Sequence, residues 1–414
     1  MPSSSMVASS VKIKDFKLDV LLKITNAINE NFSREELFEI FEDVLKNKLE
    51  IGKLALFIRE NDWNCAIRYG ISDEEFQLDA ERDLLGITEI TYLNITAEKQ
   101  FEHFDVIIPV FHKQKPLAYL LIGDIDEERI EISPTIKHRP FIQTLTNIIV
   151  VAIENKILAK ERIQQEGIKK ELQLASEMQS MLFPKELPSN DKIHVAAFYQ
   201  PHQQVGGDYY DYIRLNDHEV VFCLADVSGK GIPAAFLMSN FQAYLRTLIR
   251  KIPLFYLVQR LNSKVMQSAK GEKFITLFIA KYNVNTRVLN YINAGHNPPL
   301  LYSGTKDKSK EQDRFNLLKT GCTGLGMFEE LPKVDEGIIN VDENSTLLCY
   351  TDGVVELENP AGQEFGLEAL KIIMQECASE SVDSLNDTIR DRLIEHKAGG
   401  PYIDDIALFS CKFF

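Results

Sequence analysis

The pattern of apolar and polar positions divides the chain into three stretches. From residue 16 to about 152, strand-length apolar runs lie between amphipathic helical stretches. From 153 to 188, closely spaced charges of both signs surround a regular apolar repeat, and from 189 to 414 strand-length runs alternate with helical ones. We therefore predict two α+β domains joined by a helical linker and preceded by a serine-rich, disordered tail over residues 1–15.

The first domain is predicted to contain two helices, a small antiparallel sheet and a long exit helix. Apolar residues recur at helical spacing from Leu18 to Ile28, and Ser33 with Glu36 three residues later has the form of a capping box. The long helix is expected to begin near Pro140. Strands are expected at residues 53–58, 64–69, 106–111 and 117–122. This order of elements resembles a GAF-type sensor domain from about Phe16 to Asn155.

The repeat in the linker has the spacing of a coiled-coil seam. Four-three steps connect the residues Ile168, Leu172, Ala175, Gln179 and Leu182. One interpretation is a parallel homodimer through these helices, which would pair the domains on both sides. The alternative is a single amphipathic helix that packs on its own domain.

The second domain is predicted to alternate strands and helices. Strands are expected at residues 193–199, 219–226, 274–282, 288–293, 346–351 and 406–412. Helices are expected at residues 232–251, 254–269, 367–378 and 384–395.

Composition narrows the class of protein without identifying a partner. The 414 residues suffice for two or three domains, and 46 basic against 61 acidic residues give a formal charge of −15. That charge argues against a nucleic acid or an anionic membrane surface as the main partner. No apolar run approaches the ~20 residues of a membrane span. The six cysteines contain no Cys-x-x-Cys pair, which is typical of buried free thiols in a reducing, cytoplasmic compartment.

The clearest candidate for a functional residue is Asp226. It lies at the end of a predicted strand whose apolar run is Val220–Leu224. Phe222, Leu224 and Asp226 share one face of this strand because successive side chains alternate. A carboxylate at the end of an apolar stripe is costly to bury unless a positive group compensates its charge.

Aspartates occupy three more turns at predicted strand ends. Asp352-Gly353 follows an apolar strand, Asp404-Asp405 precedes another, and Asp208 follows Gly206-Gly207, which allow a close backbone approach. An isolated Asp-Gly is typical of a simple turn. Four such turns together indicate carboxylates that converge on hard cations, for which oxygen ligands favour Mg²⁺ or Mn²⁺ over zinc. Two such ions can make a hydroxide nucleophile near neutral pH and hold a phosphoryl group.

Five motifs occur in an order that resembles a known enzyme family. They read V-G-G-D-Y-Y-D (205–211), A-D-V-S-G-K-G-I-P-A-A-F-L-M-S (225–239), N-A-G-H-N-P-P (293–299), Y-T-D-G-V-V-E (350–356) and D-D-I-A-L (404–408). From about Leu172 to Phe414 the chain thereby resembles the bacterial branch of the metal-dependent (type 2C) protein serine/threonine phosphatases. That branch includes the sporulation stage II phosphatase and stress-response activators of sigma-factor pathways. The resemblance implies an α/β/β/α sandwich for this domain.

Carried onto this sequence, the resemblance implies a site for two Mn²⁺ or Mg²⁺ ions. Asp226 would bridge the ions, and the backbone carbonyl of Val227 would take the place of a glycine carbonyl. Asp352 and Asp404 would complete the second metal site. Asp208 would lie at the edge of the site and bind directly or through water.

Five further residues near these motifs have less definite roles. Asp405 is expected to support the ligands from behind, and Asp211 to cap or pair locally. Lys230 either assists phosphate binding, since no phosphate-binding arginine is recognisable earlier in the domain, or is a solvated lysine of the turn that Gly229 opens. His296 either acts as a general acid or satisfies backbone groups in a rigid glycine-proline turn.

The resemblance implies hydrolysis of phosphoserine or phosphothreonine on a regulatory protein, expected to be a STAS-type anti-sigma-factor antagonist. Attack on phosphorus would be direct, because no cysteine nucleophile motif is present. The first domain would act as a sensor that moves the linker, the helix after Pro233 and with it Asp226. The alternatives are a catalytically inactive pseudophosphatase that serves as a signalling scaffold, and a nucleotide cyclase or kinase output domain, against which the absence of a P-loop argues.

Overall fold

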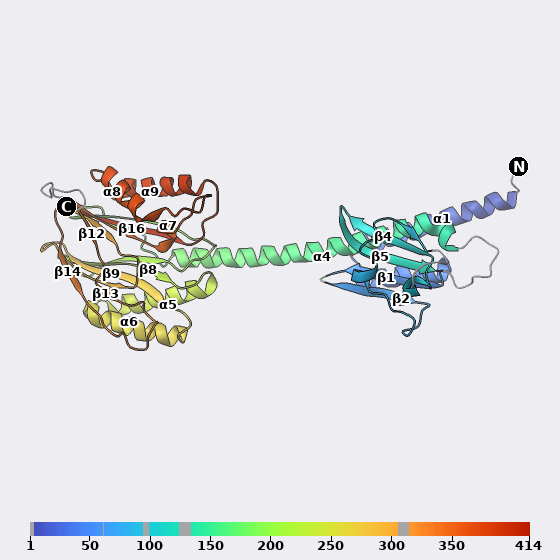
Figure 1. Cartoon of the computed structure of the whole chain (residues 1–414), viewed down its shortest axis with the longest axis horizontal. Helices are drawn as coiled ribbons and strands as arrows, with labels where there is room; N and C mark the ends of the chain where they lie inside the picture. Colours follow the sequence, from blue (N-terminus) through green and yellow to red (C-terminus); the bar gives the residue numbers. More distant parts are fainter. Residues whose placement is uncertain (1–3, 61, 94–98, 124–133, 305–313) are drawn as a thin grey trace. The chain divides into compact units, whose positions relative to one another are not determined.

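The computed structural model describes residues 4–60, 62–93, 99–123, 134–304 and 314–414 (Figure 1). Its contacts divide the chain into two compact units, Met1–Glu166 and Gly167–Phe414, and we describe each by itself.

The N-terminal unit is built on a five-stranded antiparallel sheet with the strand order β2-β1-β5-β4-β3. One face of the sheet packs on α1, α2 and α4 through Ile24, Phe41 and Ile149, and the other face packs on a second apolar cluster that includes Ala80 of α3. The strands are β1 (Lys53–Arg59), β2 (Trp63–Tyr69), β3 (Thr91–Tyr92), β4 (Val106–His112) and β5 (Lys115–Gly123). The helices are α1 (Ser4–Asn29), α2 (Arg34–Asp43), the π-helix η1 (Val44–Lys48), α3 (Ala80–Asp83), the 3₁₀-helix η2 (Lys99–Phe101) and α4 (Pro134–Ser180).

The helices and four strands predicted for this unit are present, and the capping box forms as predicted. Ser33 Oγ accepts a hydrogen bond from the Glu36 N–H at 3.1 Å, and the Glu36 carboxylate accepts one from the Ser33 N–H at 2.7 Å. The first helix is longer than predicted: α1 begins at Ser4, within the segment expected to be a disordered tail. No glycine or proline interrupts residues 4–29, so nothing in the sequence stops the helix from extending towards the N-terminus.

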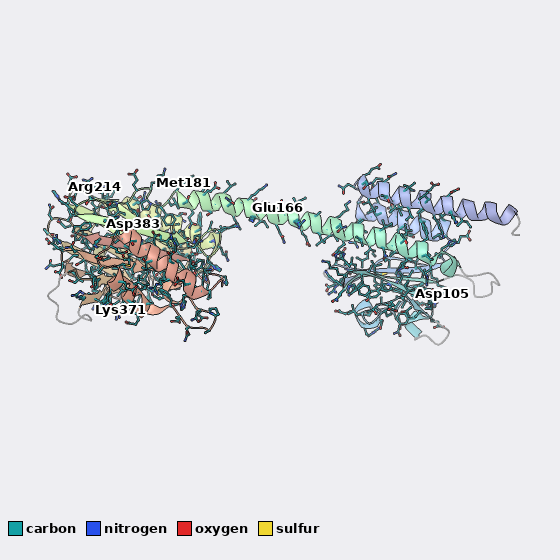
Figure 2. All side chains as sticks on the ribbon, turned by 90° about the horizontal axis from the view of Figure 1, so that it is seen from above. Asp105, Glu166, Met181, Arg214, Lys371 and Asp383 are labelled. Atoms are coloured by element: carbon teal, nitrogen blue, oxygen red, sulfur yellow. The ribbon has the colours of Figure 1, made fainter. Side chains whose placement is uncertain are left out.

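Helix α4 is 47 residues long and changes character along its length. Its first part is a core helix, with Ile142, Leu145 and Ile149 buried, whereas residues 159–171 are exposed on every side (Figure 2). Among the residues described, His138–Ser180 is the one helical stretch that matches a membrane span by length and composition, and its most apolar part is partly buried inside the protein.

The C-terminal unit has four layers, in which two β-sheets lie between two pairs of helices (Figure 1). The first sheet has the order β13-β10-β9-β8-β7 with β14 paired to β10, and the second has the order β12-β11-β15-β16-β6. The strands are β6 (Ile193–Gln200), β7 (Tyr209–Arg214), β8 (Glu219–Val227), β9 (Ile275–Asn283), β10 (Val288–Ala294), β11 (Leu300–Tyr302), β12 (Phe315–Leu317), β13 (Gly321–Cys322), β14 (Gly337–Asn340), β15 (Ser345–Tyr350) and β16 (Ile406–Phe413). The helices are α5 (Ile232–Leu248), α6 (Leu254–Ala269), α7 (Asp352–Val355), α8 (Gly366–Glu376) and α9 (Val382–Lys397).

This α/β/β/α sandwich confirms the predicted fold class. Phe222 of β8 stacks on Phe409 of β16 between the sheets, with ring centroids 5.6 Å apart. Helices α5 and α6 cover the outer face of the first sheet, and α8 and α9 cover that of the second. Strand β7 was not predicted, because its sequence Y-Y-D-Y-I-R has no continuous apolar run, although its alternate residues are buried.

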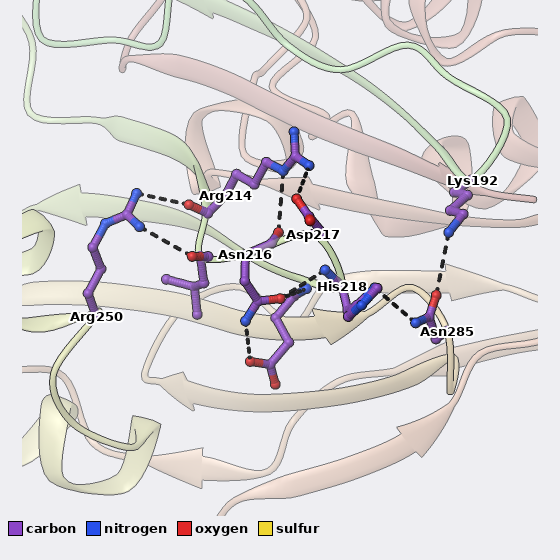
Figure 3. Close-up of polar contacts among 9 residues, drawn as sticks. Lys192, Arg214, Asn216, Asp217, His218, Arg250 and Asn285 are labelled. Atoms are coloured by element: carbon purple, nitrogen blue, oxygen red, sulfur yellow. Dashed lines mark hydrogen bonds and ion pairs between the residues drawn. The ribbon is translucent and has the colours of Figure 1, made fainter.

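The turn between β7 and β8 fixes the register of these two strands. Asn216 Oδ1 accepts hydrogen bonds from the N–H groups of His218 and Glu219 at 2.8 and 2.9 Å (Figure 3). Antiparallel pairing propagates from this turn along both strands, so the turn determines which residues lie opposite each other at the far end. There the register places Asp208 opposite Asp226.

Candidate metal centre

The first sheet brings two of the predicted ligands, Asp208 and Asp226, to one edge. Asp208 directly precedes β7, and Asp226 lies near the end of β8. Both are one residue beyond the pair formed by Tyr209 and Ala225. A Cβ on Gly207 would lie 2.8 Å from the carbonyl oxygen of Val227. The backbone carbonyl predicted to bind metal therefore lies against the loop that carries Asp208.

The second sheet brings three more carboxylates to the same edge. Asp352 opens α7 directly after β15, and Asp404-Asp405 precede the neighbouring strand β16. The Thr351 N–H donates to the Ala407 carbonyl at 3.2 Å, which holds the two strand ends together. A Cβ on Gly353 would lie 2.1 Å from the Asp405 carbonyl oxygen, so only glycine allows this approach.

Asp405 connects the two groups of carboxylates. Its side chain is buried and accepts hydrogen bonds from the N–H groups of His202 and Gly207, at 2.7 and 2.6 Å. A Cβ on Gly206 would lie 2.2 Å from the same carboxylate. Asp405 thus holds the loop that carries Asp208 against the second sheet, as expected for a residue that supports the ligands.

The pKa values of these carboxyl groups reflect their burial and, after it, their mutual repulsion. Burial, and then the charge of Asp352, raises the pKa of Asp226 to about 7. Burial and the charges of Asp226 and Asp405 raise the pKa of Asp208 well above its usual range. Burial and the charge of Asp404 likewise raise the pKa of Asp352. The site therefore favours bound protons or bound cations at neutral pH.

The donors at this site are chemically suited to a hard divalent cation. Oδ2 of Asp208 is buried and has no hydrogen-bond partner among the described residues, which is a costly state for a carboxylate oxygen. Carboxylate and carbonyl oxygens are the ligands that Mg²⁺ and Mn²⁺ prefer. No group of three Asp, Glu, His or Cys side chains in the described part of the chain has the spacing of a complete ion site.

Asp211 does not belong to this cluster. Its side chain is fully buried beneath α5 and pairs with Arg246, whose Nε and Nη2 lie 2.8 and 2.9 Å from its two oxygens. The Tyr209 hydroxyl donates to the same carboxylate at 2.5 Å. Asp211 therefore connects β7 to α5, which corresponds to its predicted local pairing.

The turn after Asp226 places a lysine beside the carboxylates. Lys230 Nζ lies 2.9 Å from Oδ2 of Asp404. Gly229 leaves room for a second lysine, Lys273, which donates to the Ser228 carbonyl at 2.9 Å. Lys230 is thus paired with a predicted metal ligand and is not a simply solvated lysine.

His296 lies behind the site in a closed turn. Its Nδ1 is 2.9 Å from Thr276 Oγ1, and its backbone N–H donates to Asn293 Oδ1 at 2.8 Å. Burial lowers the pKa of His296 to about 3, so the ring is neutral at physiological pH. These contacts favour the structural interpretation of His296 over the general acid.

Two side chains near the site were not among the predicted residues. Glu356 lies one helical turn after Asp352, and burial together with the charge of Asp352 raises the pKa of Glu356. Gln179 of α4 is buried, donates to the Gly206 carbonyl at 2.7 Å and accepts from the Gly206 N–H at 3.2 Å. The sequence held a signal for each of them. Gln179 is the polar residue in an otherwise apolar seam, and Glu356 follows Asp352 by four residues, which is about one helical turn.

The contacts of Gln179 also revise the predicted seam. Gln179 is buried and Leu182 is half-buried against the C-terminal unit. The end of the seam therefore packs on the chain's own domain. The exposed apolar residues there are Leu174 and Met178 of α4 and Met181, which directly follows the helix, and they also have four-three spacing (Figure 2 labels Met181).

Comparisons with known proteins agree with this geometry. Residues 216–414 match the family described as Stage II sporulation protein E (SpoIIE). Phosphoserine phosphatase RsbU of Bacillus subtilis (strain 168) is 30% identical over 232 residues, which cover 54% of this chain and 66% of RsbU. Protein IcfG of Synechocystis sp. is 24% identical over 378 residues, which cover 83% of this chain and 58% of IcfG. The chain thus spans about two thirds or less of the length of these relatives.

A solved structure shares the fold of the C-terminal unit. The SiaA-PP2C domain of Pseudomonas aeruginosa superposes with a TM-score of 0.52 at 18% identity, over 61% of this chain and 99% of that domain. The sandwich topology, the order of the five motifs and the family match all lie in the C-terminal unit. The C-terminal unit therefore matches the SpoIIE family over residues 216–414 and shares the fold of the SiaA-PP2C domain.

Proposed function

We propose that the chain is a metal-dependent protein phosphatase that hydrolyses phosphoserine or phosphothreonine on a regulatory protein. The convergence of five carboxylates from two sheets supports this proposal best. So many buried or half-buried carboxylates are stable together only with protons or cations among them.

The same cluster suggests a role for each predicted ligand. Asp226 would bridge two Mn²⁺ or Mg²⁺ ions, with the Val227 carbonyl and Asp208 on one side and Asp352 and Asp404 on the other. When bound, the ions would polarise the phosphoryl group and activate water. The chain itself contributes the fixed positions of these oxygens, because strand register and backbone hydrogen bonds hold each turn.

The substrate we propose is a phosphorylated STAS-type antagonist of an anti-sigma factor. The name of RsbU, a phosphoserine phosphatase, supports phosphoserine chemistry. Resemblance to sigma-factor-regulating phosphatases supports the class of substrate. We also propose that the enzyme acts in the cytoplasm.

Regulation would pass from the N-terminal unit, which we propose to be a GAF-type sensor, through α4. Gln179 of α4 holds both backbone groups of Gly206, two residues from Asp208. Leu182, which follows α4, also contacts the helix after the Asp226 turn. Its carbonyl accepts a hydrogen bond from Gln242 of α5 at 3.4 Å. A rotation of α4 would therefore act on both predicted ligands. We propose that the linkers of two chains pair to form a homodimer.

The direct test is release of phosphate from phosphoserine peptides and candidate phosphorylated STAS proteins, with Mn²⁺ or with EDTA. We expect Mn²⁺-dependent turnover that Asp226→Asn and Asp352→Asn each lower by about 100-fold or more. Asp217→Asn, an exposed change in the β7–β8 turn, is the matched control and should keep full activity. Activity that survives EDTA or either ligand substitution would contradict the proposal. Metal binding without turnover would favour the pseudophosphatase scaffold.

A further inference from the structure

We infer that Lys230 is a built-in counter-ion of the carboxylate cluster, which neutralises Asp404 in the metal-free protein and must release it when a divalent ion binds there. This inference rests on the proposed metal centre. It assigns Lys230 a role in metal affinity, whereas the sequence suggested either phosphate binding or no role.

The contacts of Lys230 are those of a cation that occupies part of a binding site. Its Nζ lies 2.9 Å from Oδ2 of Asp404 and donates to the Ile403 carbonyl at 2.5 Å. These two oxygens belong to the turn that precedes β16, whereas Lys230 belongs to the turn that follows β8. The ammonium group therefore bridges the two sheets at the edge where the carboxylates meet.

No other basic side chain has this position in the part of the chain that the structure describes. Among the described residues, Asp404 is the one of the five clustered aspartates that has an ion pair, and its partner is Lys230. Burial and Asp404 raise the pKa of Asp352, and the charge of Lys230 acts in the opposite direction. One ammonium thus partly compensates a cluster whose other charges have no basic partner.

Lys230 and a divalent ion would compete for the same oxygen. An ammonium at 2.9 Å occupies one of the lone-pair directions of this oxygen, and two cations within a few ångströms repel each other. Binding at Asp404 therefore requires Lys230 to move away. The energy of the lost ion pair is subtracted from the binding energy of the metal.

The structure leaves space for this movement. The Lys230 side chain is 39% exposed, and the residue lines a cavity of about 650 Å³ together with Leu172 and Pro233. The ammonium can enter this space without disturbing the core. Because Leu172 belongs to α4, the linker helix borders the space into which Lys230 would withdraw.

The test compares Mn²⁺ affinity in the full chain, by isothermal titration calorimetry, with thermal melting in EDTA. We expect Lys230→Gln to tighten the weaker Mn²⁺ site about threefold to tenfold, because the competing cation is removed. The same variant should melt at a lower temperature in EDTA, since Asp404 loses its partner, and this difference should vanish or reverse in saturating Mn²⁺. Lys230→Arg keeps the charge and should restore the wild-type affinity.

Lys273→Gln is the matched control. It removes the same charge from a lysine that contacts this turn through the Ser228 carbonyl and has no ion pair with the described carboxylates of the cluster. Its Mn²⁺ affinity should stay within about twofold of the wild type. Unchanged or weaker Mn²⁺ binding by Lys230→Gln, or equal tightening by Lys273→Gln, would overturn the counter-ion inference alone. A wild-type chain that binds no Mn²⁺ would overturn the proposed function as well.

Discussion

At the scale of single residues, the carboxyl group of Asp226 couples metal-free stability to pH. Its pKa of about 7, caused by burial and then by Asp352, lies above the ordinary value of 3.8. Between these values the folded chain holds a proton that the unfolded chain has released, so the free energy of unfolding falls as pH rises. Asp226→Asn should remove about 2 kcal/mol of this pH dependence. Urea denaturation in EDTA at pH 5 and pH 8 measures it, and an unchanged slope in the variant would argue against the assignment.

His296 gives the opposite dependence and separates a structural role from a catalytic one. Its pKa of about 3, lowered by burial from 6.5, means that the unfolded chain takes up a proton first as pH falls. His296 therefore contributes stability above pH 6.5 that is lost progressively towards pH 3. His296→Gln should lack this loss and keep kcat/KM near pH 7 within a few-fold.

A general acid, in contrast, would contribute about 10²–10⁴-fold to the rate. The pH profile of kcat/KM for His296→Gln and for the wild type therefore decides between the two roles. If His296→Gln lost that much kcat/KM and its pH profile lacked one of the two slopes of the wild type, His296 would be the general acid.

At this scale the sequence located turns that carry aspartates beside apolar strands, and the roles of these aspartates as ligands stay a prediction. Asp226 lies near the end of β8, Asp352 follows β15 and Asp404 precedes β16, so strand length places all three near strand ends. The pair of Lys230 with Asp404 could not be predicted, because it joins turns 174 positions apart whose approach depends on the packing of two sheets.

At the scale of elements, the contact of α4 with the Gly206 loop is the most direct route between linker and site. Gln179→Leu would leave the buried N–H and C=O of Gly206 without partners and loosen the loop that carries Asp208. We expect activity to fall about tenfold or more and Mn²⁺ affinity to weaken. Both are measured on the purified full chain.

The control for Gln179 lies on the same helix. Gln173 is exposed and its side chain donates a hydrogen bond to Glu177 of the same helix, so Gln173→Leu should leave both activity and Mn²⁺ affinity unchanged. Equal effects of the two substitutions would show that α4 acts through its general stability and not through the contact with Gly206.

The elements show which sequence signals were sufficient. The capping box at Ser33 and the long apolar strands are local signals, and the structure reproduces them. Strand β7 was not predicted because three tyrosines surround an aspartate in it, and the partners that allow Asp211 to be buried include Arg246 of α5, which is 35 positions away. The coiled-coil seam was ambiguous, because the same four-three spacing fits a partner helix or the chain's own domain.

In the whole molecule, the exposed apolar residues at the end of α4 and directly after it suggest where a second chain would pair. Leu174, Met178 and Met181 are 60–70% exposed and follow four-three spacing. If two chains pair there, Met178→Glu should shift the chain from dimer to monomer in sedimentation velocity, with unfolding unchanged. Glu177→Gln, at an exposed neighbouring position, is the control. A wild-type chain that sediments as a monomer would contradict the dimer proposal.

In the proposed centre, carboxylates from two sheets hold two divalent ions. Equilibrium dialysis against Mn²⁺, followed by elemental analysis, measures this binding without substrate or activity. We expect two Mn²⁺ per wild-type chain, and one or fewer in Asp352→Asn. No bound Mn²⁺ above background, or the same number in wild type and variant, would contradict the account.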